Sequence, residues 1–232
     1  MARYLIIAAG SGIGQSLLQH LRLGGHEVMT TARSDRTIAP DYLLDASDFD
    51  AVDAVFAKVG KVDGVVNLAG SLLLKSAALT SRSQYDATIT ASLTTAFATV
   101  RAAARHMTEG GSVVLLSSAA ALEGLANHEA IAAAKAGVIG LTRSAAASYA
   151  GQNLRINAIA PGLVETPLTA GLVGSDAGRR VSESMHALGR LGKPEDVARA
   201  IAFLLDPQND WITGQVLGVD GGLSRVRPKL KV

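Results

Sequence analysis

Cysteine is absent from this sequence, so the chain has no disulfide framework, no thiolate nucleophile and no thiolate metal ligand. An excess of either charge is also missing, because 22 Lys and Arg residues against 20 Asp and Glu leave a formal net charge of +2. The basic residues are scattered, apart from Arg225, Arg227, Lys229 and Lys231 in the tail 225–232. Nucleic-acid binding needs a basic face, so we expect no nucleic-acid partner. We interpret the tail as a solvated chain end; the alternatives are an arm for a polyanion or for a neighbouring subunit.

Long apolar runs are missing as well. No stretch reaches the roughly 18 uninterrupted apolar residues of a membrane span, and the N-terminus lacks the layout of a signal peptide. We therefore expect a cytoplasmic protein with no membrane partner. With 232 residues, 48% of them hydrophobic, the chain has enough apolar side chains for a substantial core, and we interpret residues 1–232 as a single domain.

Apolar, β-branched runs alternate with segments of helical spacing. Seven runs have the character of strands, at residues 4–9, 27–31, 42–44, 62–68, 112–116, 155–159 and 215–219. After the first of them, Ile13, Leu17, Leu18 and Leu21 recur at helical spacing. This alternation favours parallel pairing with helices on both faces. The predicted fold is therefore α/β, a doubly wound, Rossmann-like sheet of seven parallel strands.

A glycine-rich turn follows the first predicted strand and opens the first predicted helix. It comprises Gly10, Ser11, Gly12, Ile13 and Gly14. Glycine lets the backbone turn tightly and approach a pyrophosphate, whose charge is stabilised by the free amides at the start of the helix. A purely structural turn would use the same glycines, but a position directly after a first strand favours dinucleotide binding.

The end of the second predicted strand indicates which dinucleotide is bound. A carboxylate there would accept hydrogen bonds from the adenosine ribose, whereas a cation would pair with a 2′-phosphate. The sequence has Arg33 at this tip and no acid. We therefore predict NADP(H) rather than NAD(H) as the cofactor. The alternative interpretation of Arg33 is an ordinary solvated residue.

One long irregular segment, residues 163–192, follows the sixth predicted strand and carries five glycines. Ligands of doubly wound sheets bind at the carboxyl ends of the strands, next to such loops. Loops longer than about 15 residues are usually functional lids or disordered. We predict a lid over the substrate, partly helical at residues 179–187.

Motifs along nearly the whole chain resemble, in order and at matching spacing, those of the short-chain dehydrogenase/reductase family. They are the glycine turn with Ile7 and Ala8 before it, Asn-Leu-Ala-Gly at 67–70, Ser118 and Lys135, the segment 157–167 around a Pro-Gly pair, and the segments 189–198 and 213–222. The first motif departs from the family pattern, because threonine and glycine are usual where this chain has Ile7 and Ala8.

This resemblance implies a set of cofactor-binding residues. They are Gly10, Ser11, Gly12, Ile13, Gly14, Asp45, Ala46, Asn67, Ala69, Gly70, Lys135, Pro161, Gly162, Val164 and Thr166, beside Arg33. In the family, the residue at Asp45 contacts the adenine, the lysine at Lys135 binds the nicotinamide ribose and the threonine at Thr166 binds the nicotinamide amide.

The family's four catalytic positions are only half retained. A serine polarises the substrate carbonyl, a tyrosine protonates the developing alkoxide, a lysine lowers the pKa of that tyrosine, and an asparagine holds a relay water. Here the serine is Ser118 and the lysine is Lys135, but Ile131 stands at the tyrosine position and Ser92 at the asparagine position. General acid–base catalysis is worth about 10²–10⁴-fold, so we expect conventional ketone reduction to be badly impaired.

A replacement for the missing phenol is hard to find in the sequence. The four tyrosines, Tyr4, Tyr42, Tyr85 and Tyr149, fall on predicted elements away from the site. His128 shares a helical face with Ile131 and Lys135 if that helix starts early enough, and the family's enoyl-reductase branch places its tyrosine at the same spacing from the lysine. Imidazole, with a pKa of about 6.5, can donate a proton near neutrality. The alternative interpretation is a partly exposed loop histidine.

Three functions remain open on the sequence alone. The first is an NADP(H)-dependent oxidoreductase with altered proton delivery, through His128 or through water held by Ser92, Ser118 and Lys135, acting on a small carbonyl, enone or imine. The second is a catalytically silent NADP(H)-binding sensor, and the third is a structural protein.

The resemblance also implies a homo-oligomer, a dimer or tetramer built from the long helices at 84–107 and 129–150 and the C-terminal strand. Six alanines on these helices permit close helix approach: Ala102, Ala103, Ala133, Ala134, Ala145 and Ala146. The same alanines could instead be packed inside one subunit.

Overall fold

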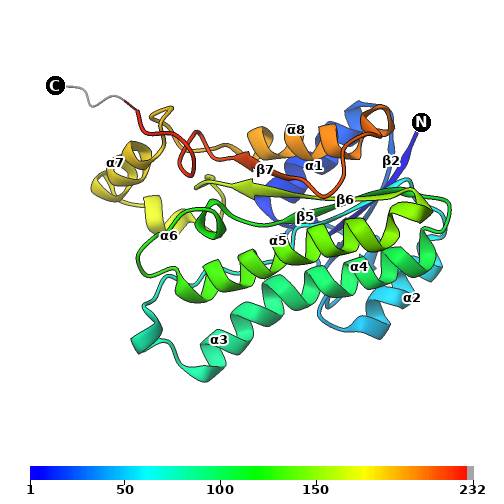
Figure 1. Ribbon diagram of the computed structural model, residues 1–232, viewed down its shortest axis with the longest axis horizontal. Coiled ribbons are helices and arrows are strands. Elements are labelled where there is room, and N and C mark those ends of the chain that lie inside the picture. Colours follow the sequence, from blue (N-terminus) through cyan, green and yellow to red (C-terminus); the bar gives the residue numbers. More distant parts are fainter. Residues whose placement is uncertain (229–232) are drawn as a thin grey trace.

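The predicted doubly wound parallel sheet is confirmed. Residues 1–228 are described by a computed structural model, and their seven strands form one parallel sheet in the order β3-β2-β1-β4-β5-β6-β7 (Figure 1). The strands are β1 (Arg3–Ile7), β2 (Glu27–Ala32), β3 (Tyr42–Leu43), β4 (Gly64–Asn67), β5 (Gly111–Leu116), β6 (Leu154–Pro161) and β7 (Val216–Val219). The chain leaves β1 toward β2 on one side, and β4 pairs with β1 on the other. The carboxyl ends of β1 and β4 therefore form the switch point at which such folds bind ligands.

Helices cover both faces of this sheet (Figure 1). They are α1 (Gly12–Leu23), α2 (Phe49–Val59), α3 (Arg82–Ile89), α4 (Thr95–His106), α5 (Glu129–Tyr149), α6 (Ala170–Val173), α7 (Asp176–Met185) and α8 (Pro194–Leu205). Helices α1 and α8 pack together on one face, and α2, α4 and α5 cover the other. Successive strand residues point to opposite faces, so Tyr4 and Ile6 join the core under α1 and α8, whereas Leu5 and Ile7 join the core under α2, α4 and α5.

Strand β1 ends two residues before the predicted position, because the backbone turns at Ala8. This residue has φ of 63°, in the left-handed region that favours glycine. Ala9 then donates a backbone hydrogen bond to Thr31 in β2 at 2.8 Å, so the chain is already leaving β1 for the turn. Ala8 thus holds a conformation that a glycine would adopt without strain.

The prediction of one long helix at 84–107 is wrong in one detail, because the helix is interrupted. Helix α3 ends at Ile89, a π-helical turn spans Thr90–Thr94, and α4 begins at Thr95. A π turn inserts one extra residue and rotates the side chains that follow. Apolar periodicity does not reveal such an insertion. Ser92 lies in the middle of the π turn, and its side chain is in the interior with an exposure of 1%.

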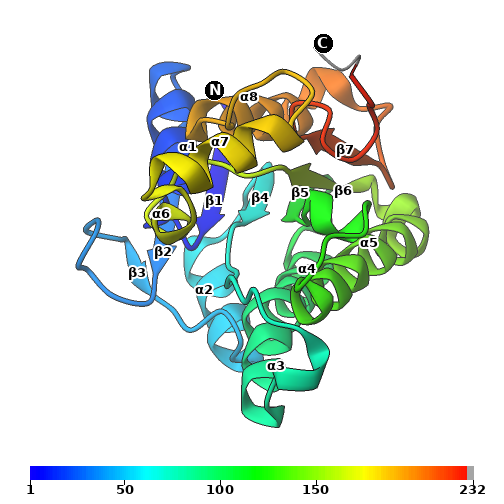
Figure 2. The same ribbon diagram turned by 90° about the vertical axis from the view of Figure 1, so that its left-hand side faces the viewer.

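The predicted lid, 163–192, contains two short helices, α6 and α7, which project from the carboxyl edge of the sheet (left in Figure 1, nearest the viewer in Figure 2). The helical part is Asp176–Met185 rather than 179–187. It starts early because Ser175 caps it, accepting a hydrogen bond from Gly178 at 3.1 Å, and it ends where His186 turns extended. An Arg179–Glu165 ion pair joins α7 to the loop after β6.

Five of the six alanines considered for subunit contacts are buried within the chain itself; only Ala133 is exposed. The interpretation that these alanines pack inside one subunit is therefore correct for those five. In the tail, Arg227 pairs with Glu123 at 2.7 Å, while Lys229 and Lys231 lie outside the described residues. Within residues 1–228, no helix combines the length and apolarity needed to cross a membrane.

The conformation of Ala8 predicts that Ala8→Gly stabilises the protein. An L-residue in the left-handed region costs roughly 1–2 kcal/mol, and the greater chain entropy of unfolded glycine offsets about 0.4–1 kcal/mol of the gain. We expect the free energy of unfolding to rise by about 0.5–1 kcal/mol in denaturant titrations. The matched control is Ala9→Gly, one residue along in a buried position without positive φ, which should destabilise. Destabilisation by both substitutions would contradict strain at Ala8.

Candidate functional site

The glycine turn has the geometry of an anion-binding helix N-terminus. Ser11 caps α1, its Oγ accepting a hydrogen bond from the Gly14 amide at 3.0 Å. A Cβ on Gly14 would lie 2.6 Å from the carbonyl oxygen of Ala9, so this close approach of turn and helix requires glycine. A Cβ on Gly12 would lie 3.1 Å from the Thr166 methyl group. The loop after β6 therefore stands directly over the turn, and a pyrophosphate on the helix amides would contact both.

The tip of β2 presents two arginines. Arg33 and Arg36 are exposed, and within residues 1–228 neither forms an ion pair. Hydrogen bonds from Ser47 lower the pKa of Asp45, and the positive charge of Arg33 lowers it further, so Arg33 and Asp45 are electrostatic neighbours. Ala46, next to Asp45, is buried. Arg36 was missed by the sequence analysis, although a second arginine three residues after the first was the signal available.

The side chain of Asn67 fixes the loop after β4. Its amide donates to Thr99 Oγ1 at 2.8 Å, its oxygen accepts from the Ala69 amide at 2.8 Å, and it is 2% exposed. Asn67 thus ties β4 to α4 and shapes the backbone at Ala69 and Gly70. A direct contact to a dinucleotide from this side chain would require these bonds to be exchanged.

Lys135 carries a buried ammonium group at the carboxyl end of β5. The side chain is 5% exposed, and Nζ donates a hydrogen bond of 2.7 Å to the carbonyl oxygen of Leu116. Burial alone lowers the pKa of Lys135 from 10.5 to about 8. Ser117 Oγ donates to the Lys135 carbonyl at 2.9 Å and so fixes helix α5 to β5. The next residue, Ser118, caps a short 3₁₀ helix (Ala119–Ala121), accepting from the Ala120 amide at 3.2 Å.

Ile131 lies one helical turn before Lys135 and is 4% exposed. A hydrocarbon side chain therefore packs where the resemblance calls for a phenol. The four tyrosines lie on other parts of the fold: Tyr4 on β1, Tyr42 on β3, Tyr85 on α3 and Tyr149 at the end of α5. The structure thus places none of them in the turn of α5 that holds Ile131 and Lys135.

Two serine hydroxyls are buried without a hydrogen-bond partner among residues 1–228, Ser92 Oγ and Ser71 Oγ. Ser92 comes from the π turn, and Ser71 directly follows Gly70. A Cβ on Gly70 would lie 3.3 Å from Lys135 Nζ and 3.9 Å from Ser92 Oγ, so these atoms surround the same glycine. Ser71 was not considered in the sequence analysis, because a serine after a loop glycine carries no pattern of its own.

His128 stands at the N-terminal end of α5. Its carbonyl accepts a hydrogen bond from the Ala132 amide at 2.7 Å, but α5 begins at Glu129 and His128 is the N-cap residue, with non-helical backbone angles. The helix therefore starts one residue later than a shared helical face with Ile131 and Lys135 requires. His128 Nδ1 lies 2.8 Å from the Ala126 carbonyl oxygen and donates a hydrogen bond to it. His128 is thus oriented by the backbone and is half-buried.

The predicted cofactor residues after β6 lie at the base of the lid. Pro161 ends β6, Val164 forms an isolated parallel bridge with Gly192, and Thr166 donates its amide hydrogen to Thr169 Oγ1 at 3.1 Å. A Cβ on Gly162 would lie 2.7 Å from His186 Nε2. His186 accepts from the Leu163 amide through Nε2 and donates through Nδ1 to the carbonyl of Ser182 in α7. His186 therefore links the end of α7 to this loop.

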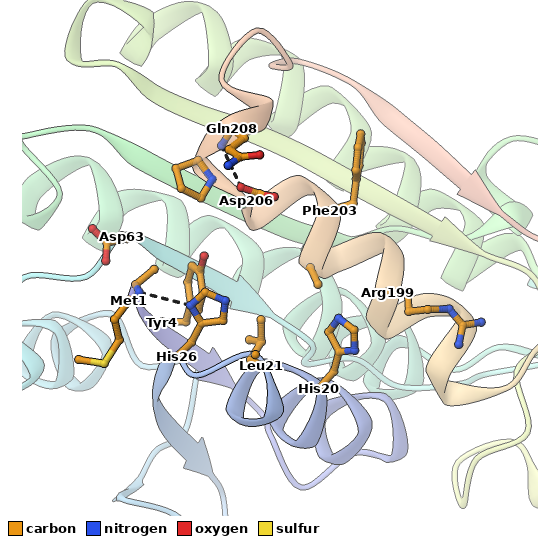
Figure 3. A pocket seen from close by; sticks show the side chains of 14 residues that line it. Met1, Tyr4, His20, Leu21, His26, Asp63, Arg199, Phe203, Asp206 and Gln208 are labelled. Carbon is orange, nitrogen blue, oxygen red and sulfur yellow. Dashed lines mark hydrogen bonds between the residues drawn. The ribbon is translucent and has the colours of Figure 1, made fainter.

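A groove of about 740 Å³ lies at the opposite edge of the sheet (Figure 3). His20 and Leu21 of α1 face Arg199 and Phe203 of α8 across it, and Tyr4 lies to one side of them, next to His26. None of the predicted site residues lines it. The predicted site residues lie instead at the carboxyl ends of the strands and in the loops that follow them.

The burial of Lys135 predicts a specific pH dependence of stability. Between pH 8 and 10.5 the unfolded chain binds more protons at this lysine than the folded protein does, so the free energy of unfolding rises with pH in this window. Below pH 8 both states are protonated and the full cost of the buried charge is present. Relative to Lys135→Met, which cannot titrate, wild type should gain about 3 kcal/mol from pH 7.5 to 10.5 in urea unfolding.

The control for this series is Lys58→Met, which removes an exposed lysine at the end of α2. A difference between wild type and Lys135→Met that stays constant across the same pH range would contradict a desolvated ammonium at Lys135.

Comparison with known proteins identifies relatives of this chain. A protein-family model described as "Enoyl-(Acyl carrier protein) reductase" matches residues 7–224. A 3-oxoacyl-[acyl-carrier-protein] reductase, FabG, of Thermotoga maritima is 35% identical, covering 94% of this chain and 96% of its own length. Carbonyl reductase family member 4 of Danio rerio is also 35% identical, covering 96% of this chain and 98% of its own length.

Solved structures agree with these sequence relatives. A short-chain type dehydrogenase/reductase from Mycobacterium ulcerans superposes with a TM-score of 0.91 at 28% identity, covering 98% of this chain and 91% of that chain. ElxO with NADP bound superposes with a TM-score of 0.89 at 29% identity, covering 96% of this chain and 99% of that chain. Given a family match over residues 7–224 and relatives aligned over almost their whole length, this chain belongs to the short-chain dehydrogenase/reductase family.

Proposed function

We propose that this chain is an NADP(H)-dependent oxidoreductase that delivers its proton without a phenol and acts on a small carbonyl, enone or imine. The observation that carries the proposal is the position of Lys135. Its ammonium donates a hydrogen bond to Leu116, which ends β5 two residues before Ser118. It lies beside the loop at Gly70. The glycine turn opens α1 at the same edge of the sheet. The grouping of Lys135, Gly70 and Ser118 at one edge of the sheet supports a retained site for cofactor and carbonyl, in which Ile131 supplies no proton.

The residues present fit a phosphorylated pyridine nucleotide. Gly14 lets the turn approach α1 closely, the free amides of α1 favour a pyrophosphate, and Arg33 and Arg36 supply unpaired cations for a 2′-phosphate. Asp45 stands beside Arg33 for the adenine, and Thr166 stands over Gly12 for the nicotinamide end. ElxO, a relative of the same fold, binds NADP, which supports this choice of cofactor.

In this proposal the bound cofactor supplies the hydride, and the chain's own residues position the substrate and provide the proton. Ser118 Oγ donates a hydrogen bond to the substrate oxygen, and Lys135 places a positive charge near the alkoxide that develops there. Without a phenol, the expected loss is about 10²–10⁴-fold in rate. Substrates with a low demand for acid, such as activated ketones, enones and iminium ions, fit this site best.

The alternative is a catalytically silent NADP(H)-binding sensor. The residues at positions 131 and 92 favour it, because both positions serve proton transfer in the family. Neither position lies on the glycine turn that is predicted to bind the cofactor. Calorimetry with NADPH and NADPH oxidation with a 3-oxoacyl thioester, an ortho-quinone and a cyclic imine separate the two. We expect binding and turnover; binding without turnover on any substrate would favour the sensor, and no binding would overturn both.

We further propose that the protein is cytoplasmic and assembles as a homodimer or homotetramer. Large apolar side chains are exposed on the side of the sheet that ends with strand β7. They are Phe203 of α8, Trp211 in the segment before β7, and Leu217 of β7 itself. Phe97 of α4 is also half exposed. Exposed apolar side chains on a predicted oligomer surface support association, although the buried alanines do not contribute to it.

The assignment of Arg33 predicts a selective loss of NADPH affinity in Arg33→Ala. Removing one charge-assisted contact to the 2′-phosphate costs about 1.5–3 kcal/mol, so the Kd for NADPH should rise about 10- to 100-fold. The Kd for NADH should change less than about 2-fold, because NADH lacks that phosphate. Isothermal titration calorimetry measures both, with Arg143→Ala on the exposed side of α5 as the control. Equal weakening of NADPH and NADH would remove Arg33 from the 2′-phosphate site.

The position of Ile131 predicts a gain of function in Ile131→Tyr. A phenol restored one turn before Lys135 should raise kcat for ketone reduction by roughly 10- to 100-fold, a fraction of the range for general acid catalysis. Ile131→Phe is the matched control, since both rings must fit the same buried space and only one carries a hydroxyl. Equal rates in the two variants, both folded and binding NADPH, would show that the geometry around the substrate oxygen is no longer that of a tyrosine-dependent reductase.

A further inference from the structure

His186 connects the lid to the loop that is predicted to hold the nicotinamide end of the cofactor. Its Nε2 accepts a hydrogen bond from the Leu163 amide at 3.1 Å, and its Nδ1 donates to the Ser182 carbonyl in α7 at 2.7 Å. A backbone amide can only donate and a carbonyl can only accept. The two bonds together therefore require the neutral ring, with its proton on Nδ1.

The imidazole is enclosed as well as hydrogen-bonded. His186 is 4% exposed, a Cβ on Gly162 would lie 2.7 Å from Nε2, and a Cβ on Gly221 would lie 3.4 Å from the His186 Cβ. Glycines at these two positions leave the space that the ring fills. Because Gly162 follows β6 and Gly221 follows β7, the ring packs between the ends of two strands and the end of α7.

Leu163 lies within the predicted cofactor loop, between Gly162 and Val164. Its amide is held by His186, and its carbonyl accepts a hydrogen bond from the Gly192 amide at 2.9 Å. Both backbone groups of Leu163 are therefore held by the part of the lid that follows α7. A ring that carries a second proton has no lone pair for the Leu163 amide, so protonation of His186 removes one of these two bonds.

Asp220 offers a protonated ring a different partner. Burial raises the pKa of Asp220, but hydrogen bonds from Ser224 and Gly222 outweigh this effect and lower it, with a smaller contribution from His186. The carboxylate is therefore ionised at neutral pH and close enough to His186 to attract an imidazolium. Asp220 and His186 also line one cavity of about 490 Å³, so there is space beside the ring.

The other charges around His186 are mostly paired with one another. On the segments that pack against the ring they are Glu165, Arg179, Arg180, Glu183 and Arg190. Arg179 pairs with both glutamates, and Arg190 pairs with Asp196. Asp220 is thus the carboxylate that an imidazolium at residue 186 would face.

Resting on the proposed function, we propose that His186 is a positioning residue for cofactor binding, and that only its neutral ring performs this role. The neutral ring fixes the Leu163 amide, and so holds the loop 161–166 in the shape that receives the nicotinamide end of NADP(H). Protonation releases the loop and weakens binding. The contribution of the bond is fully present at alkaline pH and is lost as pH falls through the range of about pH 8 to 5, in which histidines change charge.

The first test examines the ring and the loop without any cofactor. In protein labelled with ¹⁵N, the NMR shifts of the ring nitrogens distinguish the two neutral tautomers, with His186→Gln for assignment. We expect the Nδ1–H tautomer at about pH 8, together with a high protection factor for exchange of the Leu163 amide hydrogen. That protection should fall as the ring is protonated. His186→Gln keeps an acceptor that does not titrate, so its Leu163 amide should stay protected across the same range.

The second test measures the Kd for NADP⁺ by calorimetry from about pH 8 to about pH 5.5 in wild type and His186→Gln. The 2′-phosphate has its own second pKa of about 6, which affects both proteins alike. Loss of one hydrogen bond changes an equilibrium constant about 3- to 10-fold, so the Kd of wild type should rise by that factor more than the Kd of His186→Gln. His20→Gln is the matched control and should behave as wild type, because His20 is exposed in the groove at the opposite edge of the sheet.

Each measurement has an outcome that would overturn the assignment. A proton on Nε2 at about pH 8, or a Leu163 amide that stays protected in wild type after the ring has titrated, would exclude His186 as the residue that holds the loop. An equal pH dependence of the Kd in wild type and His186→Gln would defeat the inference alone. Wild type that binds no NADP⁺ at any pH would defeat the proposed function and this inference together.

Discussion

The hydrogen bond between the Lys135 ammonium and the Leu116 carbonyl is the interaction on which the arrangement of the site depends. It joins the middle of the scaffold, strand β5, to the long helix α5 at the point where the strand ends. A charge held at this depth is stable only because the backbone carbonyl of a strand end is free to accept from it. Ser117 strengthens the same junction by donating to the Lys135 carbonyl. Helix and strand are thus joined by two polar contacts inside the protein.

The rest of the fold delivers its groups to the same edge. A parallel sheet brings the carboxyl ends of β1, β4, β5 and β6 side by side, so the glycine turn, the loop at Gly70, Ser118 and the Pro161–Gly162 turn become neighbours despite their separation in the sequence. Asn67 adds a link between β4 and α4 that shapes the Gly70 loop. The π turn then rotates Ser92 toward that loop. The site is consequently a product of strand order and of one irregular helical turn.

Much of this could be predicted from the sequence, for reasons that differ by residue. The strands and the glycine turn follow from apolar alternation and from the conformational freedom of glycine, which are local properties. Arg33 followed from its place after a strand. The partnerless hydroxyls of Ser71 and Ser92 did not, because they depend on which side chains share a buried space. Arg36 is different, because it is exposed and its spacing from Arg33 was visible in the sequence. The alanines were ambiguous for a similar reason: small residues on a helix permit close packing, but the sequence does not say whether the partner is another subunit or, as for five of them here, the same chain.

The substitution at residue 131 has two consequences that act together. A tyrosine at this position would supply a proton donor, and a phenolate beside Lys135 would also stabilise the ammonium and keep it a weak acid. Isoleucine takes away both the donor and that stabilisation. The ammonium left behind, buried and paired only with a neutral carbonyl, is the more acidic for it.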